Sequence, residues 1–162
     1  MRPFRFIAAV LLLSFSLAGC AARVKNVTDL PVGVTLKQAQ DWDVAVQNLS
    51  KIASVTTTAR QAIIELHTVG LLKDGPTYVT ALQSIGKVDE LQLSASTILK
   101  QTPNNFTATT KQQVQSLLTQ IGQQLVLLDQ SGVTGIKNPN SQTQIADLIG
   151  QITGLIGVIL QL

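Results

Sequence analysis

The chain has 162 residues, of which 12 are basic and 9 are acidic, and its formal net charge is +3. A chain of this length corresponds to one domain of ordinary size. It contains no dense cluster of Lys and Arg, so the small positive charge does not favour a nucleic-acid partner. Cys20 is the only cysteine. An intramolecular disulfide is therefore excluded, and the fold must depend on its hydrophobic core.

Residues 1–19 have the composition of an export signal peptide. Arg2 and Arg5 place positive charge near the start, and a nearly continuous apolar run follows over 6–17 before the small residues that precede the cysteine. This order is typical of an export signal. The apolar run has about a dozen residues, which is too short to cross a bilayer as a helix of ~20 residues. Without the signal, ten basic residues stand against nine acidic ones, so we expect a mature net charge near +1.

The signal ends in the sequence Leu17-Ala18-Gly19-Cys20, which resembles the lipobox of bacterial lipoproteins at each of its four positions. In that family the cysteine thiol is joined to a diacylglycerol, a signal peptidase cuts before the cysteine, and the new amino terminus often receives a further acyl chain such as palmitate. The resemblance implies that Cys20 carries lipid and that the three preceding residues are recognised by the peptidase. Two or three acyl chains hold a protein firmly, whereas one holds it marginally. The alternative is a chance cysteine after an ordinary signal peptide.

The residues after the cysteine bear on location. In the enterobacterial members of the lipoprotein family, Asp directly after the lipidated cysteine favours retention in the inner membrane. Ala21 occupies that position here, so the resemblance implies an outer-membrane protein that faces the periplasm or the cell surface. In a cell with one membrane, the anchor would lie in the outer leaflet of the plasma membrane. Residues 20–34 contain Pro31 and Gly33 and show no sustained hydrophobic period, which predicts a tether of at most roughly 45 Å.

Residues 35–162 show the hydrophobic period of amphipathic helices. Thr35 and Gln38 form a predicted capping box at the start of the first helix. Three β-branched threonines at 56–58 are predicted to bend or divide that helix. Apolar residues recur at steps of three and four in four stripes: Leu36, Ala39, Trp42, Val46, Leu49, Ile52, Ala53, Ile63, Leu66 and Val69; Tyr78, Leu82, Ile85, Val88, Leu91, Ala95 and Ile98; Val114, Leu117, Leu118, Ile121, Leu125 and Leu128; Ile145, Leu148, Ile149, Ile152, Leu155, Ile156 and Ile159.

Turn signals separate the stripes. Pro and Gly residues mark turns at 74–76 and 102–105, and residues 132–140 are expected to form a loop that starts with a capping glycine. Ser141 and Gln144 predict a second capping box. No segment alternates in the manner of a strand. The sequence therefore predicts an all-α fold, an antiparallel bundle of about four helices over residues 35–162. The alternative is a pair of long helical hairpins that complete their core by oligomerising.

Ionisable residues do not converge in the pattern of a catalytic or metal site. His67 is the only histidine, and Glu65 lies two positions away, a spacing at which helical residues do not face each other. Asp41 and Asp43 point to different sides of a helix, and the adjacent acids at 89–90 also diverge. We therefore expect solvated faces at these positions. The sequence predicts no catalytic residue, no metal ligand and no cofactor, and it favours a protein that is not an enzyme.

The segment 145–162 is the most apolar part of the predicted domain. Gly150 and Gly154 form a Gly-x-x-x-Gly pair, and Gly157 extends the same small-residue surface. Such a surface lets helices approach closely, so these three glycines are a candidate helix-association face. Three interpretations remain open for this helix: it is buried in the bundle, it self-associates or docks a partner, or it inserts into the membrane.

Three other residues have two interpretations each. Trp42 lies on the first apolar stripe, which favours a core position, and the alternative is an aromatic anchor at the membrane. Gly86 and Gly122 fall inside predicted helices. We expect them to allow close helix packing rather than to bind a ligand.

Anchorage without a catalytic cluster indicates a function exerted by contact. The leading hypothesis is a lipid-anchored cell-envelope protein that acts as a non-enzymatic structural or interaction component. Its partners would be the membrane, through Cys20, and either a second copy or another envelope protein. One alternative is a carrier of a small apolar ligand or lipid at the membrane surface, and another is a surface-exclusion lipoprotein of prophage type. An enzyme that depends on His67 is the remaining alternative.

Overall fold

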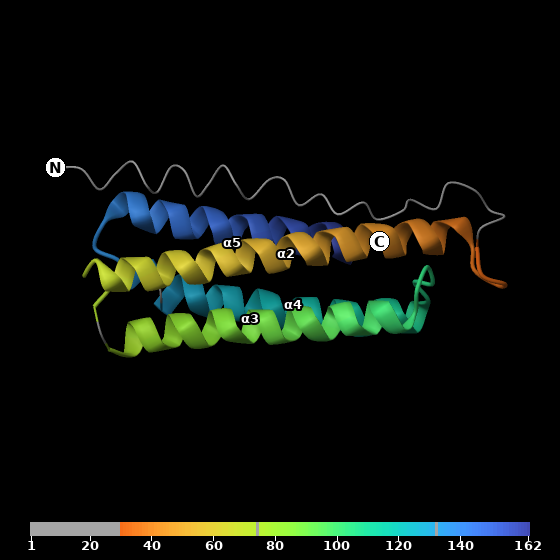
Figure 1. Cartoon of the computed structure of the whole chain (residues 1–162), viewed down its shortest axis with the longest axis horizontal. Helices are drawn as coiled ribbons and strands as arrows, with labels where there is room; N and C mark the ends of the chain where they lie inside the picture. The colour runs from red at the N-terminus through yellow and green to blue at the C-terminus, as the bar shows by residue number, and fades with distance from the viewer. Residues whose placement is uncertain (1–29, 74, 132) are drawn as a thin grey trace.

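The computed structural model describes residues 30–73, 75–131 and 133–162. Its helical elements, in chain order, are α2 (Leu36–Thr68), α3 (Pro76–Gln101), α4 (Ala108–Ser131), the 3₁₀ helix η2 (Val133–Gly135) and α5 (Pro139–Leu160) (Figure 1). The described residues include no β-strand. The predicted all-α fold is confirmed.

The four long helices form an antiparallel bundle (Figure 1). Each of α2 and α4 packs against both α3 and α5, so the helices enclose a common core. One end of the bundle holds the start of α2 and the α3–α4 connection. The opposite end holds the α2–α3 and α4–α5 connections. Short connections between antiparallel neighbours are the ordinary topology of such a bundle.

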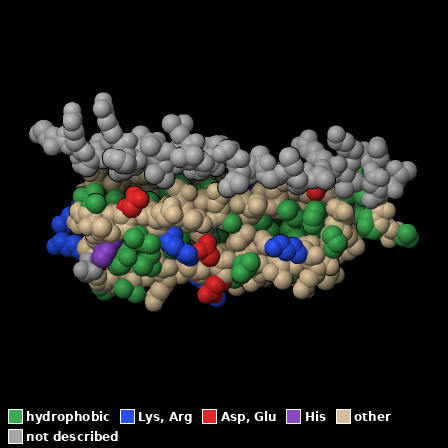
Figure 2. All heavy atoms as spheres, in the orientation of Figure 1, with side chains coloured by type: hydrophobic (Ala, Val, Ile, Leu, Met, Phe, Trp, Pro, Cys, Tyr) green, Lys and Arg blue, Asp and Glu red, His purple; other side chains and the backbone are tan. Residues whose placement is uncertain are grey.

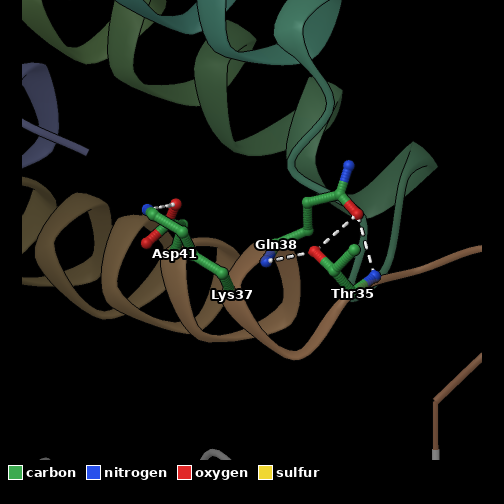
Figure 3. A network of polar contacts seen from close by, with 4 residues as sticks. All are labelled: Thr35, Lys37, Gln38 and Asp41. Carbon is green, nitrogen blue, oxygen red and sulfur yellow. Dashed lines mark hydrogen bonds and ion pairs between the residues drawn. The ribbon is translucent and has the colours of Figure 1, made fainter.

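The first helix begins at the predicted capping box (Figure 3). The Thr35 Oγ1 accepts a hydrogen bond from the Gln38 backbone N at 3.2 Å, and the Thr35 backbone N donates to the Gln38 Oε1 at 2.9 Å. Two backbone N–H groups that the helix itself cannot satisfy thus gain partners. One turn further, Lys37 and Asp41 form an ion pair across the exposed side of the helix. The predicted start of this helix is confirmed.

Helix α2 continues without division through its three consecutive threonines. The hydroxyls of Thr56, Thr57 and Thr58 donate to the carbonyl oxygens four residues earlier, at 2.8, 3.0 and 3.1 Å. This bonding within the helix satisfies each hydroxyl, including the fully buried Thr56. The prediction of a divided helix is therefore wrong.

The start of α5 also differs from the prediction. The Asn138 side chain accepts hydrogen bonds from the backbone N of Asn140 at 2.9 Å and of Ser141 at 3.3 Å. Pro139 occupies the first helical position, where its fixed φ suits the helix and its missing N–H costs nothing. Ser141 already lies inside the helix, so the predicted capping box of Ser141 with Gln144 is wrong.

The α4–α5 connection is partly structured rather than a simple loop. It contains η2, and it buries the side chains of Val133 and Ile136. A Cβ added to Gly135 would lie 2.4 Å from the Thr77 Cγ2, so a larger residue at this position would force the Thr77 side chain to move. The backbone N of Lys137 donates to the carbonyl oxygen of Leu71 at 3.2 Å. The two connections at this end of the bundle are thereby joined.

The core consists of two clusters of buried side chains, one toward each end of the bundle. Trp42 packs against the cluster near the start of α2, and its Nε1 donates to the Leu99 carbonyl oxygen at 2.9 Å. Trp42 is half-buried, and its buried side packs against the core as predicted. The buried residues outside the predicted stripes include small ones, such as Ala45, Ala59, Ala81 and Ser84, and larger ones, such as Leu99 and Phe106.

Candidate functional site

The predicted lipidation site lies outside the described residues. Leu17, Ala18, Gly19 and Cys20 all precede residue 30, and so does most of the predicted tether. The described part of the chain begins with a turn over residues 31–34, in which the backbone N of the last residue bonds the first carbonyl oxygen at 3.1 Å. This turn leads directly into α2. Lipidation of Cys20 and its recognition by a peptidase stay predictions.

His67 lies in the last turn of α2 and stacks on the ring of Tyr78 from the first turn of α3. The ring centroids are 3.9 Å apart and the planes differ by 7°. His67 also borders a shallow open depression with Thr68, Gly70, Leu72 and Lys73. Figure 2 shows the histidine at the surface near one end of the bundle. The stack joins α2 to α3 beside their connection.

The acidic residues of α2 do not converge on a common point. Asp41 pairs with Lys37, whereas Asp43 lies on a buried part of the helix surface. Glu65 is exposed near the other end of α2. Within the described residues, no group of three or more His, Cys, Asp or Glu side chains is placed to hold a metal ion.

The adjacent acids of α3 have separate basic partners. Asp89 forms an ion pair with Arg60 of α2, and Glu90 pairs with Lys87 at 2.8 Å on the exposed side of α3. Burial raises the pKa of Asp89, and the positive charge of Arg60 opposes part of that rise. These contacts hold helices together or lie in solvent, and neither aligns two carboxylates for acid–base chemistry.

The candidate helix-association face lies on the outside of α5. Gly150 and Gly154 are exposed and Gly157 is half-buried, and a Cβ added to any of them would meet no atom within 4 Å. The opposite side of α5 is its buried side: Ile145, Leu148, Ile152, Ile156 and Ile159. The bundle-helix interpretation is therefore confirmed for the isoleucine side. The glycines take no part in that packing.

Gly86 and Gly122 show the same openness. A Cβ at either position would meet no atom within 4 Å, so the prediction that they allow close helix packing within the chain is wrong. Both glycines lie toward the outside of their helices. The spacing of large apolar residues in the sequence does not show whether a glycine between them is packed against another helix or exposed.

By length and composition, α5 resembles a membrane-spanning helix. It has 22 residues, and an 18-residue window within it has a mean hydropathy of 1.5. The core helix of a bundle can meet the same criterion, and one side of α5 is buried in this bundle. Membrane insertion of this helix stays an untested alternative.

Charged residues are distributed unevenly among the helices. Helices α2 and α3 carry ten Lys, Arg, Asp and Glu residues, whereas α4 and α5 carry three. The three are Lys111, Asp129 and Asp147. Because α4 and α5 are neighbours in the bundle, one side of the molecule is almost uncharged. Sequence reasoning missed this side, since it depends on which helices pack together.

Comparisons with family models, with curated proteins and with solved structures find no match for this chain.

Proposed function

We propose that this protein is a lipid-anchored component of the bacterial cell envelope that acts by contact rather than by catalysis. The observation that carries the proposal is the lipobox, Leu17-Ala18-Gly19-Cys20, at the end of an export signal. Asp41 and Asp89 pair with separate basic residues and His67 stacks on Tyr78, so these side chains do not share a reaction centre, which supports the second half of the proposal.

The tether keeps the bundle close to the membrane. Residues 21–34 span at most roughly 45 Å when fully extended, and α2 with its 33 residues is about 50 Å long. The bundle can therefore stand on the bilayer or lie along it, and α2 cannot begin more than about 45 Å from the anchored residue. Ala21 at the position after the lipidated cysteine favours the outer membrane. The partner would be another envelope protein or a second copy of this chain.

The anchor is tested by comparing the wild-type chain with Cys20→Ser in the same cells. We expect the wild type to incorporate labelled palmitate and to fractionate with membranes, and the variant to be released into the soluble envelope fraction. Ser50→Ala, an exposed position on α2, is a matched control that should behave as the wild type does. The anchor proposal fails if the wild type takes up no palmitate and Cys20→Ser still sediments with membranes.

Contact as the mode of action is tested by crosslinking intact envelopes and capturing the protein. Wild type that yields specific adducts, lost or reduced for Cys20→Ser, supports the proposal. A lipidated protein that yields only monomer contradicts it, whatever the outcome of the palmitate experiment. No observation on the described residues favours the carrier or the surface-exclusion alternative over this proposal.

A further inference from the structure

One side of α4 combines an open surface with two opposite charges. The Gln115 Nε2 donates to the Leu160 carbonyl oxygen at 3.2 Å, so this side of α4 borders α5. Gly122 and Asp129 follow Gln115 at steps of seven residues, or about two turns, and Lys111 precedes it by one turn. All four residues therefore lie along the same side of α4.

Helix α5 adds a second row of small residues beside this one. Thr153 and Ala146 precede Leu160 at seven-residue steps and are exposed, as is Gly150. On α4, the Val126 side chain is 54% exposed. We define the α4–α5 face by the uncharged residues of both rows: Gln115, Thr119, Gly122, Val126, Ala146, Gly150 and Thr153.

The charges at the two ends of α4 have no partners within the described chain. Lys111 and Asp129 are the only charged residues of α4, and neither forms an ion pair with another described residue. They are 18 residues apart, which is five helical turns or about 27 Å. Because the two charges are opposite in sign and lie at opposite ends of α4, this side of the helix is complementary to the same side of a second, antiparallel copy.

We propose that the α4–α5 face binds a second copy of this chain, with the two α4 helices antiparallel about a twofold axis. In a twofold interface, a contact from one residue of the first copy to a different residue of the second copy is repeated with the two copies exchanged. Lys111 of each copy then lies opposite Asp129 of the other, and two ion pairs flank an uncharged centre. A partner of one net charge would not match this pattern, because it would repel one end of the stripe.

The size of the face suits a weak dimer. Helix α5 is about 33 Å long, and two packed helices present a surface about 20 Å wide, which together give about 650 Å² for each copy. Two such faces bury roughly 1,300 Å², near the lower end of the ~1,200–2,000 Å² of specific complexes. The proposed lipid anchor would raise the local concentration of copies and favour such a contact, so this inference deepens the proposed function.

The first test places one cysteine near the expected axis. Residue 120 is midway between the two charges, and Thr119 is the exposed residue of the face closest to it. We expect the full chain with Thr119→Cys to form a disulfide-linked dimer in oxidised envelopes. A cysteine close to a twofold axis lies near the same cysteine of the second copy, within reach of a disulfide. Thr97→Cys, at another exposed threonine on α3, is the matched control and should stay monomeric. Equal crosslinking of both variants, or none, would overturn the inference.

The second test reverses the charges in the Thr119→Cys chain. Lys111→Glu or Asp129→Lys alone brings like charges together and should raise the dissociation constant about tenfold, the order expected for close charge pairs at an interface. The double reversal restores complementarity and should restore the crosslink. Lys100→Glu on α3 should have no effect. A double variant no better than either single one contradicts the proposed arrangement, provided that circular dichroism shows an intact bundle.

A version with Cys20→Ser separates this inference from the anchor. Its sedimentation at high protein concentration measures dimer formation without lipid. A dimer that responds to the charge reversals supports the inference even if anchorage fails. A strictly monomeric chain at millimolar concentration, together with an unlinked Thr119→Cys envelope sample, overturns it even if Cys20 proves to be lipidated.

Discussion

Arg60 of α2 and Asp89 of α3 form an ion pair that joins two neighbouring helices. About a third of the Asp89 side chain remains exposed, and burial of the rest raises the pKa of its carboxyl group while the Arg60 charge lowers it. Burial has the larger effect, so ionised Asp89 is less favourable in the folded chain than in the unfolded one.

Asp89 should therefore contribute stability at acid pH and lose it as pH rises. A group with a raised pKa in the folded state binds its proton more tightly there, so its contribution is complete below its unfolded pKa of about 4 and is lost as pH rises through the folded pKa. Relative to Asp89→Asn, the wild type should gain stability as the pH falls from 7 to 4, and partial exposure of the carboxyl group keeps this gain small. Urea unfolding at several pH values measures this difference, and a difference that shrinks on acidification would contradict it.

The cap of α5 is tested at two neighbouring positions. Asn138→Ala removes the oxygen that accepts from two backbone N–H groups, and it should lower the free energy of unfolding by ~1 kcal/mol. Ser141→Ala should change stability by much less, because Ser141 lies inside the helix and alanine has the higher helix propensity. Denaturant unfolding of both variants decides between the observed cap and the predicted one. A larger loss for Ser141→Ala would favour the predicted cap.

Gly135→Ala should destabilise the chain, because its new methyl group would lie 2.4 Å from the Thr77 Cγ2. We expect a cost of about 1–3 kcal/mol, as for other overpacked sites. Gly150→Ala, where a Cβ meets no atom within 4 Å, is the matched control and should stabilise the helix by up to ~1 kcal/mol. The double variant Gly135→Ala with Thr77→Ser, which removes the clashing methyl group, should recover part of the loss. Thermal unfolding that ranks the two alanine variants in the opposite order would count against the close approach.

Trp42→Phe should lower the free energy of unfolding by about 1 kcal/mol, because it removes the hydrogen bond from the indole N to the Leu99 carbonyl oxygen. The loss is modest, since the same carbonyl also accepts from the Thr102 backbone N. Circular dichroism in urea measures the change, because the variant has no tryptophan to report by fluorescence. If Trp42 faced the membrane instead, the stability of the chain in solution would not fall.

The helical period allowed the fold class to be predicted, because each stripe of large apolar residues marks the side of a helix that must leave water. The capping box at Thr35 and the start of α3 at Pro76 were also predictable, since both depend on residues within one turn of chain. The start of α5 was not predictable from the sequence, because Asn138 and Ser141 are both favourable N-cap residues. The conformation of the preceding loop determines which of the two caps the helix. Buried alanines such as Ala45 and Ala81 were missed because small residues suit a core and a surface equally well.

The sequence alone identified the candidate anchor, because resemblance to a lipobox depends on four consecutive residues and not on the fold. It also supplied the glycines of α5, but only the tertiary structure placed them outside the bundle, opposite the buried isoleucines. Lys111 and Asp129 were visible as two isolated charges 18 residues apart. Only the tertiary structure shows that the side of α4 that carries both charges borders α5, because Gln115 on that side donates to the Leu160 carbonyl oxygen. Packing decides which side of a helix remains free, and that choice depends on contacts between segments far apart in the chain.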